Sequence, residues 1–150
     1  MRLFLCFDTI AYPSGPLSSE ALQCQLLNYH LSTAIMISIY HNPRCSKSRQ
    51  TLQLLEDKGI SPEIVLYLET PPNKAILQGL LNKLAISPRQ LLRKSEADYK
   101  ENNLKDTTLS DAQLLDFMVK FPKLIERPIV VNGDKAALGR PPEAVLEILP

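Results

Sequence analysis

A cysteine at the junction of a predicted strand and a predicted helix constrains this chain more than any other feature. The short apolar run at 36–40 predicts a buried strand, and Pro43 then ends regular structure. After Cys45, apolar residues recur at helical spacing as far as Gly59, a residue typical of helix C-termini. We therefore expect Cys45 at the start of a helix over 46–58, where free N–H groups and the helix dipole favour an anion.

This position predicts a reactive thiol. Cysteines at helix N-termini have pKa values of roughly 3.5–7.5, against about 8.5 for a free thiol. His41, Arg44 and Lys47 add positive or protonatable groups to the same segment. A free cysteine is often only a small buried hydrophobe, but Cys45 lies between Arg44 and Ser46, so no apolar residue flanks it. We therefore interpret Cys45 as a nucleophile placed where an oxyanion can bind.

Composition excludes several classes of function. The formal net charge of the 150 residues is +1, which argues against general binding to nucleic acid or to a membrane surface. No apolar run approaches the roughly 18 residues that span a bilayer, and the apolar run at 3–7 is too short for a signal peptide. The cysteines Cys6, Cys24 and Cys45 have no paired spacing, which fits a reducing compartment. We expect a cytoplasmic protein without a bound metal or cofactor.

Residues 1–35 differ from the rest of the chain. A loop signal, Pro13-Ser14-Gly15-Pro16, is followed at 19–31 by a pattern for one weak helix. Met36 stands directly before the first predicted strand. We favour the interpretation that residues 1–35 are an extension outside the core and that 36–150 form the domain. The alternative is an N-terminal arm that packs on this domain.

Strands and helices alternate after Met36. The apolar run at 64–68 has the length and composition of a buried parallel strand. Helices are predicted at 73–84, 87–92 and 110–121, each with a capping residue at its start, while 95–109 is polar and irregular. Short strands at 129–131 and 136–138 flank a predicted hairpin turn at 132–134, and a last helix follows Pro141 and Pro142.

This order of elements predicts an α/β fold of thioredoxin-like architecture. Two parallel strands and a hairpin would form a four-stranded mixed sheet, flanked by helices and carrying a helical insertion between its two halves. In this architecture the nucleophilic cysteine belongs at the start of the first helix, where Cys45 lies. The segment Arg127-Pro128 is then expected to face Cys45, at the position where thioredoxin folds have a cis-proline.

Six segments carry a resemblance to a known family. They are Tyr40–Cys45, Ser48–Arg49, Tyr67–Pro72, Leu91–Lys94, Glu126–Val131 and Gly139–Pro141. In this order, they resemble the glutathione- and glutaredoxin-coupled arsenate reductases. The resemblance covers nearly all of 36–150 and nothing in 1–35.

The resemblance implies an oxyanion site. Cys45 would attack arsenate, and Arg93, Arg127 and Arg140 would hold arsenate and its thiol adduct. The planar fork of arginine suits a tetrahedral oxyanion. Most arginines are only surface cations, but Arg127 and Arg140 each precede a proline at the edge of a predicted strand. The assignment of Arg93 depends mainly on the resemblance.

The resemblance also gives roles to His41 and Ser48. His41 would help to keep the thiol ionised, and the Ser48 hydroxyl would support the thiolate. The less favoured alternative is that His41 is an ordinary loop histidine without a role.

The implied reaction uses glutathione as co-substrate and glutaredoxin as partner. Glutathione would join the arsenic adduct, arsenic would pass from the V to the III state, and glutaredoxin would clear the disulfide left on Cys45. Two features depart from the better-known reductases, since Ser46 and Lys47 replace smaller neutral residues and the chain ends at Pro150. Both features are typical of a short subgroup of the family.

Other functions are compatible with the same fold. RNA-polymerase-binding redox regulators use a Cys-x-x-Cys switch, but Ser48 stands at the second position and excludes a local disulfide. A glutaredoxin-like monothiol oxidoreductase would not need three arginines. A low-molecular-weight phosphatase needs Cys-x5-Arg, and Thr51 stands where that arginine would be.

Overall fold

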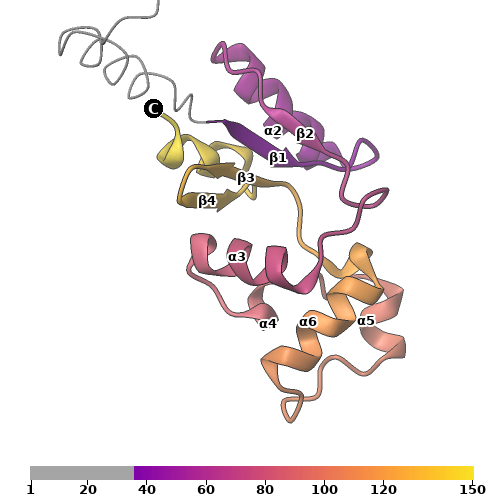
Figure 1. The fold of residues 1–150 in the computed structure, drawn as a ribbon. Coiled ribbons are helices and arrows are strands. Elements are labelled where there is room, and N and C mark those ends of the chain that lie inside the picture. Colours follow the sequence, from indigo (N-terminus) through magenta and orange to yellow (C-terminus); the bar gives the residue numbers. More distant parts are fainter. Residues whose placement is uncertain (1–35) are drawn as a thin grey trace, which may run out of the picture. The chain divides into compact units, whose positions relative to one another are not determined.

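The computed structural model describes residues 36–150, so the predicted extension at 1–35, with its weak helix, lies outside the described residues. Within the described part, one sheet has the strand order β2-β1-β3-β4 (Figure 1). Its strands are β1 (Ile37–Tyr40), β2 (Glu63–Val65), β3 (Ile129–Asn132) and β4 (Lys135–Leu138). Strand β1 is parallel to β2 and antiparallel to β3, and β3 and β4 form an antiparallel hairpin. The predicted four-stranded mixed sheet is confirmed.

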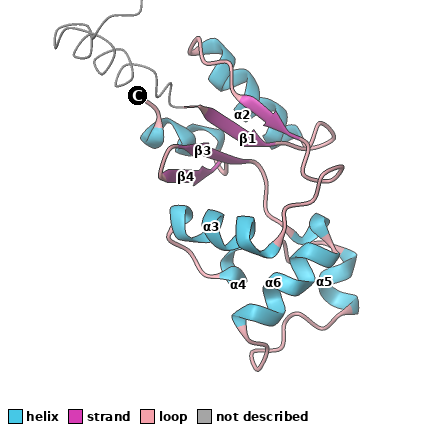
Figure 2. Ribbon diagram, viewed as in Figure 1, coloured by secondary structure: helices cyan, strands magenta, loops and turns pink. Residues whose placement is uncertain are grey.

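Helices and short turns of 3₁₀ helix lie between these strands and after β4 (Figure 2). They are α2 (Ser46–Asp57), α3 (Lys74–Leu84), α4 (Pro88–Leu91), α5 (Ala97–Glu101), α6 (Asp111–Lys120), η1 (Pro122–Leu124) and η2 (Pro142–Ile148). The predicted caps are present, because the Asn73 side chain accepts a hydrogen bond from the backbone of Ile76 and Ser110 begins a capping box. These caps satisfy N–H groups that a helix leaves without internal partners.

The sheet packs against helices on both faces. Alternate residues of β3 point to opposite sides, so Val130 joins one apolar cluster while Ile129 and Val131 join another. The smaller cluster packs β1 and β3 against α2 and η2, through Ile39 and Leu55. Each such fully buried aliphatic side chain stabilises the fold by about 1.5–3 kcal/mol.

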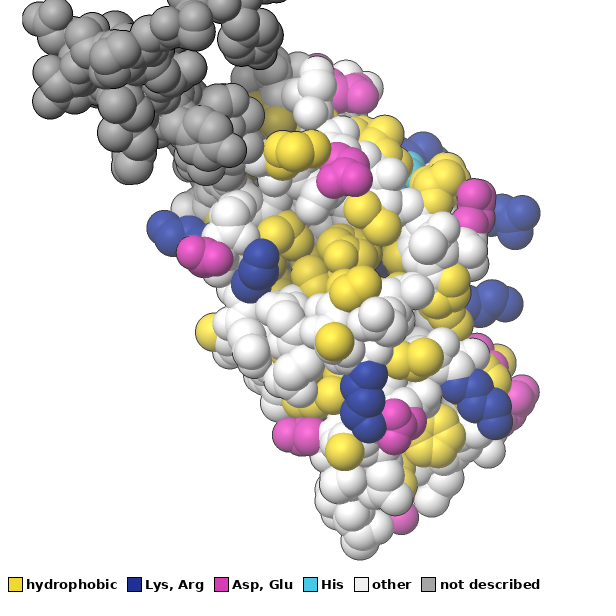
Figure 3. All heavy atoms as spheres, viewed as in Figure 1, with side chains coloured by type: hydrophobic (Ala, Val, Ile, Leu, Met, Phe, Trp, Pro, Cys, Tyr) yellow, Lys and Arg dark blue, Asp and Glu magenta, His cyan; other side chains and the backbone are white. Residues whose placement is uncertain are grey.

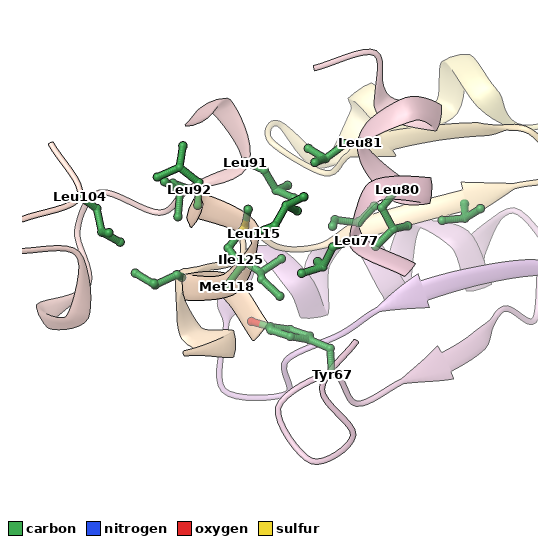
Figure 4. Close-up of a cluster of buried hydrophobic side chains, with 14 residues drawn as sticks. Tyr67, Leu77, Leu80, Leu81, Leu91, Leu92, Leu104, Leu115, Met118 and Ile125 are labelled. Carbon is green, nitrogen blue, oxygen red and sulfur yellow. The ribbon is translucent and has the colours of Figure 1, made fainter. Parts of the chain in front are cut away.

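The larger cluster joins the sheet to the helical insertion (Figure 4). Leucines of α3, α4 and α6 form a large part of it, and Figure 4 shows Tyr67 pointing into it from the connection that follows β2. Tyr67 is fully buried. The insertion is therefore anchored to the sheet through an apolar core, which fixes the segments that connect them.

Three details differ from the expectations. The strand predicted at 64–68 ends at Val65 and lies at the sheet edge, where Ile64 is 48% exposed, because only β1 pairs with it. The chain then turns, with the N–H of Thr70 donating to the carbonyl of Leu66. Helix α5 lies in the region predicted to be irregular, and the last helix, η2, has 3₁₀ geometry.

One face of the described part of the chain has a shallow apolar pocket (Figure 3). Apolar side chains gather between the sheet and α3, around a cavity of about 300 Å³ whose lining includes Tyr40, Ile76 and Val131. Among the described residues, no helix is both long enough and apolar enough to cross a membrane.

Candidate active site

The register of the sheet brings three chain segments together at one end of strands β1, β3 and β4. Tyr40 of β1 pairs with Ile129 of β3, and Ile129 pairs with Leu138 of β4. The residues just beyond these positions, at 41–45, 127–128 and 139–140, therefore come together. The peptide bonds Arg127–Pro128 and Arg140–Pro141 are both cis, which confirms the cis-proline expected at Arg127-Pro128.

A tight turn delivers Cys45 to the start of α2. The N–H of Cys45 donates to the carbonyl of Asn42 at 2.9 Å, and the Asn42 side chain accepts from the N–H of Arg44 at 2.9 Å. Pro43 occupies the second position of this turn, where its fixed φ is favourable. Cys45 is then the N-cap residue of α2, with extended φ and ψ of −93° and 121°. The predicted position of the cysteine is confirmed.

The surroundings of Cys45 favour its thiolate. Burial raises the pKa of the thiol, but the backbone N–H groups of Ser48 and Lys47 lower it, and so do the positive charges of Arg127 and Arg140. The net effect is a pKa below the ordinary value. No side-chain hydrogen bond caps the helix, so these N–H groups act on the sulfur as nearby dipoles.

Ser48 connects the cysteine turn to His41. Its hydroxyl accepts a hydrogen bond from the N–H of Asn42 at 3.0 Å and lies 2.9 Å from His41 Nδ1. Ser48 is fully buried and His41 is nearly so. The Ser48 group that acts on Cys45 is therefore the backbone N–H, while the hydroxyl holds the turn in place.

His41 lies behind the turn. Burial lowers the pKa of its imidazole, and the positive charge of Arg49 lowers it further. Both effects favour the neutral ring at pH 7. Nδ1 of a neutral imidazole can accept a hydrogen bond from the Ser48 hydroxyl, so the structure links His41 to the thiol through Ser48 and the turn.

A cleft of about 550 Å³ opens beside Cys45. Its basic lining residues are Arg44, Lys47, Arg93, Lys123, Arg127 and Arg140, and the carboxylate among its described lining residues is that of Glu96. Cys45 and the three predicted arginines thus lie in one cleft, whereas His41 and Ser48 are outside its lining. A cleft so rich in cations attracts small anions.

An antiparallel bridge places Arg93 in the cleft. Leu92 pairs with Ile125, and the N–H of Arg93 donates to the carbonyl of Leu124 at 2.7 Å. The N–H of Glu126 donates to the carbonyl of Leu91 at 2.9 Å. These bonds join the end of α4 to the segment that leads into β3.

Three hydrogen bonds fix Arg127, two from its guanidinium and one to its carbonyl. Its Nη1 donates to the carbonyl of Lys123 at 3.0 Å, and its Nη2 donates to Glu96 Oε1 at 3.2 Å. Its carbonyl accepts from Arg140 Nε at 3.0 Å. Burial lowers the pKa of Arg127, but Tyr67 and Glu96 more than compensate and raise it, so the guanidinium stays charged.

Two glutamates hold the three arginines together. Glu96 Oε1 lies 2.7 Å from Arg93 Nε as well as 3.2 Å from Arg127 Nη2. Glu126 Oε2 lies 3.0 Å from Arg140 Nε and 3.9 Å from Arg93 Nη1. The result is an alternating chain of charges in which each carboxylate reduces the repulsion between two guanidiniums.

Sequence reasoning missed these two glutamates as site residues. The signal for Glu96 was its position three residues after Arg93, a spacing that suits ion pairs on one turn of chain. Glu126 stands directly before Arg127. Within residues 36–150, no group of three or more His, Cys, Asp or Glu side chains is arranged to hold a metal ion.

The fold and the site define a thioredoxin-like α/β protein whose helix-capping cysteine faces a cluster of fixed arginines. The sequence model of the ArsC family matches residues 40–148. The chain belongs to the ArsC family, as the resemblance of its motifs implied.

Relatives and solved structures agree with this assignment. A Haemophilus influenzae protein named arsenate reductase is 54% identical over 114 residues, which cover 75% of this chain and 98% of that protein. An Escherichia coli arsenate reductase is 49% identical over 76% of this chain and 81% of its own length. An uncharacterised Escherichia coli K12 protein, YfgD, is 58% identical over 75% of this chain and 96% of its own.

The structure of an arsenate reductase from Vibrio cholerae has a TM-score of 0.75 and 53% sequence identity. The match covers 77% of this chain and 99% of that one. The matched segment is thus almost the full length of several relatives.

Proposed function

We propose that this protein reduces arsenate to arsenite, with Cys45 as the nucleophile and with glutathione and glutaredoxin as the external thiols. The observation that carries the proposal is the cleft that gathers Cys45 with Arg93, Arg127 and Arg140. Relatives at 54% and 49% identity that are named arsenate reductases support it.

The first step uses the anion-binding character of the cleft. The three guanidiniums bind the arsenate oxygens, and the Cys45 thiolate attacks arsenic. A sulfur–arsenic bond forms, an arsenic–oxygen bond breaks, and the oxygen leaves as water after taking up protons. The lowered pKa of Cys45 raises the fraction of thiolate available for this attack.

The second thiol must come from outside the domain. The sequence has no cysteine between 46 and 150, and Ser48 occupies the position of a Cys-x-x-Cys partner. In the proposed scheme a glutathione thiol binds the arsenic of the adduct and displaces a second oxygen as water. The two sulfur–arsenic bonds then break: two of their four electrons form one sulfur–sulfur bond, and the other two remain on arsenic, which passes from V to III.

Glutaredoxin completes the cycle by thiol–disulfide exchange. The product of the reduction is a mixed disulfide of glutathione and Cys45, which a glutaredoxin thiolate attacks on the glutathione sulfur. Cys45 leaves as a thiolate, and the N–H groups and guanidiniums that lower its pKa make it a good leaving group.

The test is arsenate-dependent oxidation of NADPH in the presence of glutathione, glutaredoxin and glutathione reductase. We expect turnover with the parent chain and none with Cys45→Ser. Thioredoxin should be a poor substitute for glutathione with glutaredoxin. Removal of glutathione from a mixed-disulfide peptide without arsenate turnover would instead identify a glutaredoxin-like oxidoreductase.

A further inference from the structure

Glu96 places a carboxylate in a cleft that is otherwise lined by many basic residues. Its side chain is only 21% exposed, and it lines the cleft together with Cys45, Arg93, Arg127 and Arg140. A carboxylate at an anion site repels any bound anion that has no proton to share with it. The Glu96 carboxylate should therefore weaken the binding of anions without a proton more than the binding of protonated anions.

The Glu96 carboxylate keeps capacity to accept another hydrogen bond. Its contacts with Arg93 at 2.7 Å and with Arg127 at 3.2 Å both use Oε1. An ionised carboxylate has about four lone-pair sites on two oxygens, so Oε2 is left for another donor. Since the partners of Oε1 are two of the proposed oxyanion ligands, a bound oxyanion would lie close to this carboxylate.

Tetrahedral oxyanions differ in what they offer such an acceptor. Near neutral pH, arsenate and phosphate retain at least one O–H group, whereas sulfate has none. Guanidiniums and ammonium groups are donors only, so the basic residues of the cleft bind all three anions through bare oxygens. Only an acceptor distinguishes the protonated anions from sulfate.

We propose that Glu96 is a specificity-determining residue that accepts a hydrogen bond from the protonated oxygen of a hydrogen oxyanion and so excludes sulfate. The inference rests on the oxyanion site of the proposed function, but it does not depend on turnover. Selectivity arises from both parts of the interaction, a hydrogen bond with the correct anion and charge repulsion with the wrong one.

Glu126 provides a matched control. It also joins two of the arginines, with Oε2 at 3.0 Å from Arg140 Nε and 3.9 Å from Arg93 Nη1, and its side chain is equally buried at 21% exposure. The cleft lining includes Glu96 but not Glu126. A merely structural role in holding arginines would make the two glutamates equivalent, and the proposal makes them different.

The test measures binding of inorganic phosphate and of sulfate to the full chain by isothermal titration calorimetry at about pH 8, where both anions are mainly dianions. We expect the parent to prefer phosphate by roughly tenfold or more, as for a hydrogen bond to a charged group. Glu96→Gln should lose most of this preference by gaining affinity for sulfate, because its amide can donate to a bare oxygen. Glu126→Gln should keep the preference.

Several results would overturn the proposal. Equal affinities of the parent for phosphate and sulfate would by themselves contradict a role of Glu96 in specificity. That result would not contradict the proposed oxyanion site. An unchanged preference in Glu96→Gln, or an equal loss in Glu126→Gln, would reduce Glu96 to a structural ion pair. Binding of neither anion would remove the oxyanion site, and with it both proposals. If Glu96→Gln does not fold, the parent still tests the proposal, because equal affinities for phosphate and sulfate would overturn it.

Discussion

At the scale of single residues, the character of Cys45 depends on opposing effects. Burial raises the pKa of its thiol, while the N–H groups of Ser48 and Lys47 and the guanidiniums of Arg127 and Arg140 lower it. The dipoles are part of the fold, whereas each guanidinium depends on one side chain. Substitution of an arginine therefore separates the two contributions.

The alkylation rate of Cys45 against pH measures this balance. We expect a midpoint below the value of about 8.5 for a free thiol, and a higher midpoint in Arg140→Gln because a nearby positive charge is removed. Lys105→Gln makes the same change in net charge at an exposed residue outside the cleft lining, so its midpoint should match the parent. A parent midpoint at or above about 8.5 would contradict an activated thiol.

His41 should make stability depend on pH. Because its pKa in the folded protein lies below the ordinary value of 6.5, the unfolded chain takes up the proton first as pH falls. The folded state then loses stability from about pH 6.5 downward, until the pH passes the folded-state pKa. Urea unfolding at pH 7.5 and 5.5 should show a larger loss in the parent than in His41→Asn. Equal losses would mean that His41 titrates normally.

The residues of the site were predictable to different degrees. Cys45 followed from the strand, the turn and the helix around it, because these signals are local in sequence. Arg93 depended on family resemblance, since the bridge between Leu92 and Ile125 that positions it joins distant segments. Glu96 and Glu126 were missed because a carboxylate beside an anion site opposes simple charge complementarity.

At the scale of elements, local signals succeeded where they are chemically specific. The caps at Asn73 and Ser110 marked helix starts, and Gly133, with φ of +57°, lies in the predicted hairpin turn. The strand predicted over the apolar run at 64–68 was too long, because a buried apolar residue such as Tyr67 occurs equally well in a connection between elements. Helix α5 was missed because its five residues are too few for a periodic pattern.

Two glycines test the packing around these elements. A Cβ at Gly139 would clash with Thr51 Oγ1 of α2 and would lie 2.7 Å from Pro128 Cγ. Gly139→Ala should therefore destabilise the protein by about 1–3 kcal/mol.

Gly79 is the control, because it lies inside α3 with nothing within 4 Å of such a Cβ. Gly79→Ala should therefore stabilise the protein by about 0.5–1 kcal/mol. Urea unfolding measures both, and equal effects would show that the contact at Gly139 relaxes easily.

At the scale of the whole molecule, net charge hides the character of the site. The chain carries a formal charge of only +1, but six of its basic residues line the cleft beside Cys45. The fold collects them from the start of α2 and the turn before it, from the helical insertion and from the segments that flank the β3–β4 hairpin, so composition alone could not reveal this basic cleft. Order along the chain predicted the architecture, and sheet register produced the cleft.

A chain that begins at Met36 should fold and act like the parent. The motivation is that the family match covers 40–148 and that Met36 stands directly before β1. We expect the same urea midpoint and the same arsenate-dependent turnover. Aggregation, or a loss of several kcal/mol from the free energy of unfolding, would make residues 1–35 part of the core.

The identity of the disulfide partner of Cys45 during turnover tests the central claim most directly. Mass spectrometry of intermediates trapped by rapid acid quench should find a mixed disulfide of Cys45 and glutathione, both in the parent and in the double variant Cys6→Ser/Cys24→Ser. That variant should turn over like the parent, because in the proposed scheme Cys45 needs only glutathione and glutaredoxin to complete the cycle. A bridge from Cys45 to Cys6 or Cys24, with loss of turnover in the double variant, would contradict the account.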